Sequence, residues 1–474
     1  MRRIKIVATI GPQTDSPEAV RALVEAGMDV ARLNGAHATR EWHAKMVKVL
    51  RQEAPHVPIL FDIPGRKIRT GILEHEPTFK AGETLVLTTD PSYKGREKVP
   101  VTYPKLHEDL AAQTTILADD GQVRLTVLEV DGRDIICRAE TAGVLRSAKG
   151  INVPSVALRS AVLNERDLGI LEFSKTQGVD FIGVSFVESD EHVGTVRELL
   201  GSRGPRIVAK IETRKGLQAV AAIAQVADAL MVDRGDLSVE TALEQVAVFQ
   251  KEILRVARSA KCPVIVATEM LHSMIAHPVP TKAEVSDITN AILDGAAALM
   301  LSGETAIGAF PVESVGLMRR VADVAWEHVQ ALEAERGGPD LENIPQAMGE
   351  AIALLCRRLP ITKIIAVTIS GFAARMVAAY RPRQPIFAVS NDPASVRSFN
   401  LLPGTQGVYV DIPFSRTSTN HIPKCLEALW RSGRLGDEEM ILVTAVGYPK
   451  PQNRMNLVET HVVADLRESL GWRR

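Results

Sequence analysis

The segment FDIPGRKIRTG, residues 61–71, marks the point at which the pattern of the chain changes. An apolar run ends here on one carboxylate, Asp62, and a proline and a glycine then turn the chain. Three cations follow the turn: Arg66, Lys67 and Arg69. Strand and helix patterns alternate before this segment, whereas helical periodicity is scarce for many residues after it. The fold is therefore predicted from the strand and helix patterns before and after this segment.

The residues before the segment predict a βαβαβ unit. The strand-like runs, rich in β-branched residues, are residues 5–11, 30–34 and 59–63. The helical segments are residues 16–27, with Ser16 as the expected N-cap, and residues 40–53. Alternation of this kind is typical of a parallel sheet covered by helices.

The residues after the segment predict an inserted β module. Residues 83–89, 122–130 and 134–140 have strand-like patterns and are separated by turn signals. Helix and strand then alternate again, from residue 164 onward, with strands expected at residues 181–186, 206–212, 229–233, 264–270 and 297–304. Three strands before the insertion and five after it make eight, each apolar enough to be buried on both faces. Eight parallel strands with intervening helices predict a closed (β/α)₈ TIM barrel.

The C-terminal part predicts a separate domain with an open α/β sheet. A charged stretch containing glycine and proline, residues 333–343, precedes it. Its expected strands are residues 363–368, 386–390, 408–412 and 440–446. We therefore expect a barrel domain formed by residues 1–66 and 156–335, an all-β lid domain at 67–155, and a C-terminal α/β domain at 345–474.

Composition narrows the functional classes. The 474 residues carry 56 Lys and Arg against 57 Asp and Glu, a formal charge of −1, so no global field favours nucleic acid or an anionic membrane. The four cysteines have no metal-binding spacing, which suggests thiols in the core of a protein from a reducing compartment. The N-terminus has no apolar stretch of signal-peptide length, and no long uncharged run follows. We expect a cytoplasmic protein with no nucleic-acid or membrane partner.

Polar residues gather where the predicted barrel strands end, which is where a parallel barrel has its active site. They are Arg32, Asn34, Asp62, Lys210, Glu212, Asp236, Thr268 and Ser302. Glu212 and Asp236 are carboxylates on neighbouring strands, a donor set that suits Mg²⁺. Lys210 and Arg32 supply positive charge for an anionic substrate, which we expect to be phosphorylated. The backbone N–H groups of residues 234–236 could hold a substrate carboxylate.

A series of short motifs, in this order and at these separations, resembles the pyruvate kinase family over nearly the whole chain. The motifs are ATIGP (8–12), ARLN (31–34), IRTG (68–71), DDG (119–121), KGIN (149–152), AKIE (209–212), RGDL (234–237), AEVSD (283–287) and MLSGET (300–305). The last two are the most specific. The family has a (β/α)₈ barrel interrupted after its third strand by a mobile β lid and followed by a C-terminal α/β domain. The resemblance implies transfer of a phosphoryl group from phosphoenolpyruvate to ADP, giving pyruvate and ATP in glycolysis.

The resemblance also implies roles for individual residues. Glu212 and Asp236 would hold Mg²⁺, Lys210 would neutralise charge on the transferring group and the enolate, and Arg32 would grip the phosphoryl oxygens. Thr268, with Gly235 and Asp236, would bind the substrate carboxylate. Thr268 and Ser302 would deliver a proton through ordered water, since neither hydroxyl is itself an acid.

For the nucleotide, the matching positions are Asn34, His37, Arg69, Asp120 and Lys149. His37 has a second interpretation, as a loop histidine that caps the helix after it.

Two departures from the family concern its K⁺ site. Residues 34–37 are Asn-Gly-Ala-His where most members have Asn-Phe-Ser-His, so the hydroxyl that ligates K⁺ is missing at Ala36. Lys67 stands where a glutamate is usual. We expect its ammonium to lie against Asp62, beside Asn34, and to make K⁺ unnecessary. The alternative is a surface ion pair between Lys67 and a lid carboxylate.

Other departures leave more open. Asp233 replaces a small residue beside the metal loop and would either perturb the metal site or point away, while Glu269 and His272 stand where Gln and Glu are usual. The C-terminal domain keeps part of an effector loop, at Thr368, Ser370 and Gly371. The second effector segment, residues 446–456, has lost its glycine pattern, so a phosphorylated effector other than a sugar bisphosphate is expected, or a helix start without ligand.

The resemblance further implies a homotetramer with allosteric control. Two rival functions share parts of this pattern. A metal-dependent lyase or aldolase on the same barrel would also stabilise a pyruvate enolate, but would have no need of Arg69, Asp120 or Lys149. A non-catalytic regulatory relative would explain the altered loops, but not the intact set of Lys210 and Glu212 with their neighbours.

Overall fold

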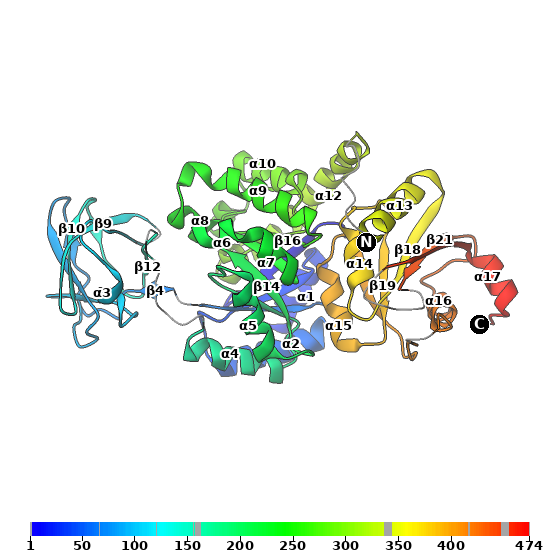
Figure 1. The fold of residues 1–474 in the computed structure, drawn as a ribbon, viewed down its shortest axis with the longest axis horizontal. Helices are drawn as coiled ribbons and strands as arrows, with labels where there is room; N and C mark the ends of the chain where they lie inside the picture. Colours follow the sequence, from blue (N-terminus) through cyan, green and yellow to red (C-terminus); the bar gives the residue numbers. More distant parts are fainter. Residues whose placement is uncertain are drawn as a thin grey trace.

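The computed structural model describes residues 2–65, 67–119, 121–154, 156, 163–335, 344–415, 418–446 and 455–473, without the side chains of residues 330–335. Three bodies lie in a row (Figure 1). A β lid is at one end, a helix-covered barrel is in the middle, and an α/β domain is at the other end. The expected fold class is confirmed.

Eight parallel strands close the barrel in the order β1-β17-β16-β15-β14-β13-β3-β2. They are β1 (Lys5–Thr9), β2 (Val30–Asn34), β3 (Ile59–Ile63), β13 (Phe181–Val184), β14 (Arg206–Ile211), β15 (Ala229–Asp233), β16 (Val264–Ala267) and β17 (Ala298–Leu301). Nearly every residue in them is buried, which explains their continuous apolar runs. The lid is inserted between β3 and β13, after the third strand as expected.

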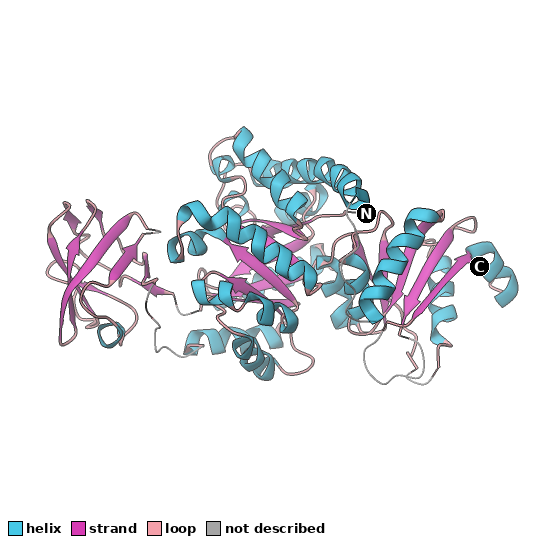
Figure 2. Ribbon diagram, turned by 45° about the horizontal axis from the view of Figure 1, so that its top comes forward, coloured by secondary structure: helices cyan, strands magenta, loops and turns pink. Residues whose placement is uncertain are grey.

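Helices surround the barrel (Figure 2). They are α1 (Pro17–Ala26), α2 (Arg40–Glu53), α4 (Glu165–Thr176), α5 (Asp190–Leu200), α6 (Arg214–Gln218), α7 (Val220–Val226), α8 (Arg234–Glu240), α9 (Val246–Ser259), α10 (Lys282–Asp294), α11 (Gly303–Ala306) and α12 (Pro311–Glu335), with 3₁₀ turns η1 (Leu243–Gln245) and η2 (His272–Ile275). The Ser16 hydroxyl accepts the Ala19 N–H at 3.1 Å, so this predicted N-cap is confirmed.

The lid contains one larger sheet in the order β4-β12-β8-β9-β10-β6-β7. Its strands are β4 (Ile68–Arg69), β6 (Thr84–Thr88), β7 (Val99–Pro100), β8 (Thr115–Ala118), β9 (Val123–Asp131), β10 (Asp134–Ala139) and β12 (Gly150–Asn152); β5 (Thr78–Phe79) pairs with β11 (Gly143–Val144), and α3 (Leu106–Asp109) is a single turn. The sequence predicted β6, β9 and β10, because only longer strands show a clear alternation. The lid has its own hydrophobic core, separate from that of the barrel.

The C-terminal domain has a five-stranded sheet in the order β20-β19-β18-β21-β22, in which β22 is antiparallel. The strands are β18 (Ile361–Val367), β19 (Ile386–Ser390), β20 (Thr405–Tyr409), β21 (Met440–Ala445) and β22 (Leu457–Val462); the helices are α13 (Ile344–Arg358), α14 (Phe372–Ala378), α15 (Pro393–Ser398), η3 (Phe399–Leu401), α16 (His421–Arg431) and α17 (Val463–Leu470). The predicted strand at 408–412 begins earlier, at Thr405. It includes Gly407, an unusual strand residue that is needed because a Cβ there would lie 2.0 Å from the Val396 carbonyl oxygen.

The two smaller bodies occupy opposite ends of the barrel. At the amino ends of the strands, Lys5 Nζ donates to the Thr405 carbonyl of the C-terminal domain at 2.8 Å. At the carboxyl ends, Asn152 of the lid donates to Glu240 at 3.0 Å. The strand ends that carry the candidate residues therefore face the lid (Figure 1).

Two expectations from composition can be compared with the structure. The four cysteines are buried free thiols, and burial raises the pKa of each to about 12: Cys137, Cys262, Cys356 and Cys425. Their interpretation as core thiols is confirmed. Within the part of the chain that the structure describes, no helix is both long enough and apolar enough to span a lipid bilayer.

Candidate active site

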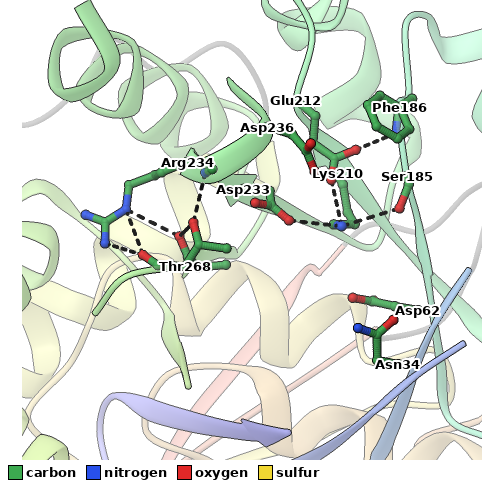
Figure 3. Close-up of polar contacts among 12 residues, drawn as sticks. Asn34, Asp62, Ser185, Phe186, Lys210, Glu212, Asp233, Arg234, Asp236 and Thr268 are labelled. Atoms are coloured by element: carbon green, nitrogen blue, oxygen red, sulfur yellow. Dashed lines mark hydrogen bonds and ion pairs between the residues drawn. The ribbon is translucent and has the colours of Figure 1, made fainter. Parts of the chain in front are cut away.

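Lys210 lies at the centre of the candidate site (Figure 3). Its side chain is buried near the end of β14, with Nζ 2.6 Å from Glu212 Oε1 and 3.0 Å from Asp233 Oδ2. Nζ also donates to Ser185 Oγ at 3.3 Å. Burial acts to lower the pKa of Lys210, but the two carboxylates outweigh it and hold the pKa well above its usual range. A fixed positive charge therefore stands at the strand ends.

Three carboxylates meet beside this ammonium. Oxygens of Glu212, Asp233 and Asp236 lie within 4.8 Å of one another. Glu212 Oε2 accepts the Phe186 N–H at 2.7 Å. Burial and the charges of Asp233 and Asp236 raise the pKa of Glu212 to about 8, although Lys210 acts to lower it. Carboxylates this close together, two of them buried, need a cation, and oxygen donors of this kind fit Mg²⁺.

Asp233 was the residue whose direction the sequence left open. Its carboxylate points into the site, toward Lys210 (Figure 3). Burial acts to raise the pKa of Asp233, but Lys210, Arg32 and Lys67 together hold it below the usual range. Asp233 is therefore an anion within the carboxylate cluster.

Arg32 and Asp62 form a second buried ion pair across neighbouring strands β2 and β3. Arg32 Nε lies 2.7 Å from Asp62 Oδ2, and another guanidinium nitrogen donates to Thr9 Oγ1 at 3.1 Å. The adjacent strand makes room for Asp62 with Gly183, where a Cβ would lie 1.8 Å from Asp62 Oδ1. Asn34, at the end of β2, uses its side-chain oxygen to accept the Ala36 N–H at 3.1 Å.

Thr268 is held in a strained conformation after β16. Its φ is 68° and that of Glu269 is 55°, a region that costs energy for a β-branched residue. The Arg234 guanidinium donates to the Thr268 carbonyl and pairs with Asp287 at 2.6 Å. The Thr268 hydroxyl accepts the Gly235 N–H at 3.0 Å (Figure 3). The expected substrate-carboxylate residues Thr268, Gly235 and Asp236 are thus brought together.

Ser302 follows β17 and is anchored by a neighbouring carboxylate. Its N–H donates to Glu304 Oε2 at 2.8 Å, and the other oxygen of Glu304 accepts the Leu271 N–H at 3.0 Å. Glu304 is 2% exposed, so it ties the β17 end to the segment after β16. Sequence reasoning did not single out Glu304.

The expected nucleotide residues come from both the barrel and the lid. Partial burial and then the charges of Arg69, Arg32 and Arg166 lower the pKa of His37, so a charge on the lid acts on this barrel loop. Arg69 donates to the Ala148 carbonyl at 2.9 Å. Elsewhere on the lid, Lys149 pairs with Asp119 at 2.7 Å, whereas Asp120 lies outside the described residues.

The expected partner of Lys67 was wrong. Its ammonium forms an ion pair with Asp236, an expected metal ligand, rather than with Asp62. Two contacts explain the difference. Asp62 already pairs with Arg32, and Lys67 runs along Gly150, where a Cβ would lie 2.9 Å from Lys67 Cε.

Comparison with known proteins agrees with this geometry. A family model described as "Pyruvate kinase, barrel domain" matches residues 1–315, and one described as "Pyruvate kinase, alpha/beta domain" matches residues 346–461. The chain belongs to the pyruvate kinase family. The relatives include pyruvate kinase from Geobacillus stearothermophilus, 38% identical over 98% of this chain and 81% of that protein. Pyruvate kinase from Mycobacterium intracellulare is 35% identical over 98% of this chain and 99% of that protein.

Membership of the pyruvate kinase family confirms the resemblance drawn from the motifs and the expectation of a phosphotransferase. Family membership does not assign a role to the residues at which this chain differs from the family pattern. Glu269 and His272 are exposed, at and just beyond the strained turn that follows β16. The candidate effector residues Ser370 and Gly371 line a cavity of about 190 Å³ between the barrel and the C-terminal domain, together with Arg206 and Arg375.

The other proposed effector residues are Thr368 and the second effector segment. The Thr368 hydroxyl closes its own loop by accepting the Gly371 N–H at 3.0 Å. Most of the second effector segment, residues 447–454, lies outside the described residues.

Several residues that shape this pyruvate kinase site were not found from the sequence. Ser185 and the Phe186 N–H contact the key residues but belong to none of the quoted motifs. Arg234 opens the RGDL motif, but only its backbone N–H was considered, not the side chain that holds the Thr268 carbonyl. Strand-end position was the signal available, since all three follow directly after β13 or β15.

Proposed function

We propose that this protein transfers the phosphoryl group of phosphoenolpyruvate to ADP, giving pyruvate and ATP, as a glycolytic phosphotransferase. The observation that carries the proposal is the buried ammonium of Lys210 beside Glu212 and Asp233, with Asp236 in the same cluster. In the reaction, the bond between phosphorus and the enol oxygen breaks, and a terminal oxygen of ADP bonds to phosphorus. The enolate left behind takes a proton at its terminal carbon.

The carboxylate cluster supports Mg²⁺ as the cofactor. Glu212 and Asp236 would hold the ion, and carboxylate oxygens are donors that it prefers. When bound, Mg²⁺ would neutralise charge on the substrate carboxylate and on the bridging oxygen. The protein would supply the remaining positive charge from Lys210, which faces the developing enolate, and from Arg32, which grips the phosphoryl oxygens.

The substrate carboxylate would lie against the start of α8 and Thr268. The N–H groups of Gly235 and Asp236 and the Thr268 hydroxyl are the proposed donors. The Gly235 N–H now donates to Thr268 Oγ1 at 3.0 Å and the Thr268 hydroxyl to the Ala267 carbonyl at 2.6 Å, contacts that support a common site and that substrate binding would exchange. We propose that Thr268 and Ser302 pass a proton to the enolate through water, because hydroxyl groups are too weakly acidic to donate directly.

ADP would lie between barrel and lid. His37 and Asn34 from the barrel, with Arg69, Asp120 and Lys149 from the lid, are the proposed nucleotide residues. The influence of Arg69 on the pKa of His37 supports a shared location, and a lowered pKa leaves His37 neutral at pH 7. His37 would then contribute a hydrogen bond rather than a charge.

K⁺ is proposed to be unnecessary. The hydroxyl found in the family is replaced by Ala36, and Asp62 is already neutralised by Arg32. The Lys67 ammonium adds a further positive charge within the same site, through Asp236. A monovalent cation at this site would therefore have fewer oxygen ligands than in the family pattern, and it would be repelled by more positive charge.

A coupled assay of pyruvate formation from phosphoenolpyruvate and ADP, with Mg²⁺, tests the function. We expect turnover that requires both substrates and the metal. Pyruvate formed by cleavage of a larger substrate, with no use of ADP, would instead indicate a lyase or aldolase. Binding of phosphoenolpyruvate without turnover would indicate a non-catalytic relative.

The assembly and its control are proposed from the family alone. We propose a cytoplasmic homotetramer whose barrel (1–66 and 156–335), lid (67–155) and C-terminal regulatory domain (345–474) have the limits expected from the sequence. A phosphorylated effector is proposed at the loop of Thr368, Ser370 and Gly371. The nearby guanidinium groups of Arg206 and Arg375 support an anionic ligand there.

A further inference from the structure

Asp233 is placed for a role other than supporting the helix that follows it. It is the last residue of β15 and precedes the first turn of α8, a position where aspartate usually accepts a backbone N–H of the helix. Asp233 makes no such capping bond. Its carboxylate is buried, and Oδ2 lies 3.0 Å from Lys210 Nζ.

Lys210 and a divalent cation would need the same oxygen of Glu212. Oε2 of Glu212 already accepts the Phe186 N–H at 2.7 Å. Oε1, which lies 2.6 Å from Lys210 Nζ, is the oxygen left for a metal ion. An ammonium and a divalent cation on one oxygen repel each other. Lys210 therefore needs a second anion once the metal binds.

Asp233 is placed to meet this need, since its carboxylate contacts Lys210 Nζ. Asp62 also favours the charged form of Lys210, but it is paired with Arg32 at 2.7 Å. Ser185, the other partner of Lys210, is neutral and its hydroxyl is 3.3 Å away, so it cannot replace an anion. We propose that Asp233 is a positioning residue for Lys210, holding its ammonium at the strand ends while the divalent cation occupies Glu212 and Asp236. The inference rests on the proposed function, since the metal and the phosphoryl transfer belong to it.

The competing interpretation is that Asp233 is itself a metal ligand. One of its oxygens lies within 4.8 Å of an oxygen of Glu212 and an oxygen of Asp236, so distance alone does not exclude this role. The two roles differ in what is lost when the charge is removed. A metal ligand changes metal affinity, whereas a positioning residue for Lys210 changes the rate of the chemical step.

The test uses the full chain with the nearly isosteric change Asp233→Asn. Mn²⁺ binding without substrate is measured from the electron paramagnetic resonance of the free ion, and kcat and KM are measured with Mg²⁺. We expect kcat to fall on the order of 10²-fold, as for other displaced electrostatic groups. The KM for phosphoenolpyruvate and the Mn²⁺ affinity should stay within about threefold of the parent values, because the variant keeps both metal ligands.

Glu240→Gln is the matched control, since Glu240 is also on α8 and influenced by Asp236 but contacts Asn152 of the lid instead. It should leave kcat within about threefold of the parent value. A kcat for Asp233→Asn within threefold of the parent, or a tenfold weaker Mn²⁺ affinity, overturns the proposal.

A double-mutant cycle tests the proposal even if Asp233→Asn changes the stability of the protein. If Asp233 acts through Lys210, Asp233→Asn should reduce kcat no further in a Lys210→Met background. Additive losses overturn the proposal. The parent assay separates this outcome from failure of the proposed function, because a parent without ADP-dependent turnover refutes the function itself.

Discussion

Replacing Lys210 by methionine removes the charge at the centre of the site while keeping most of the length of the unbranched side chain. The ammonium lies 2.6 Å from Glu212 and 3.0 Å from Asp233. At an effective dielectric near 20, and with both carboxylates ionised, these separations correspond to about 6.4 and about 5.5 kcal/mol of attraction. Much of that is offset by desolvation, and breaking a buried pair typically costs about 3–5 kcal/mol of folding free energy.

Lys210→Met should reduce kcat even in variant protein that is fully folded. Lys210 would face the enolate as it forms, so its charge matters most in the transition state. We expect kcat to fall on the order of 10²- to 10³-fold or more, with the KM for phosphoenolpyruvate changed only several-fold.

Urea denaturation and the coupled assay measure the two effects. Lys210→Arg serves as the comparison, because it keeps the charge but not the shape of the ammonium. A folded Lys210→Met variant with turnover within a few-fold of the parent would refute the assigned role. An unchanged unfolding free energy would refute the ion-pair contribution.

Three further predictions concern protons, K⁺ and the lid. A Glu212 carboxyl with a pKa of about 8 must lose its proton to bind metal, so Mn²⁺ affinity without substrate should rise from pH 6 toward pH 8 and level off above it; a flat profile in a binding titration contradicts this. Turnover should be equal with and without K⁺, whereas Lys67→Glu combined with Ala36→Ser should become K⁺-dependent; K⁺ activation of the parent contradicts the proposal. Replacing residues 69–150 by a short glycine linker should leave a folded barrel, because the lid has its own core, but should abolish phosphoryl transfer since Lys149 is lost; full activity in the coupled assay contradicts the assigned lid role.

The barrel and its order of strands could be predicted from the sequence because each strand is buried on both faces. Such strands appear as separate apolar runs, and the residues that follow them must lie at one end of a parallel barrel. The close approach of Lys210 and Glu212 was predictable for a similar reason, since Glu212 directly follows β14 and residues two apart in an extended backbone point to the same side. Short lid strands such as β4 and β12 carry too few residues for this periodicity.

The partners of the charged groups were decided by the tertiary structure. Lys67 contacts Asp236 rather than Asp62 because the pairing of β4 with β12 directs its side chain along Gly150. Asp233 turns toward Lys210 instead of capping α8.

The sequence by itself thus determined which residues stand at the strand ends, because strand periodicity is a local property of the chain. Only the tertiary structure decided which cation neutralises which carboxylate. That choice is made between residues as far apart as Lys67 and Asp236, and it depends on distances of a few ångströms that arise once lid and barrel are packed together.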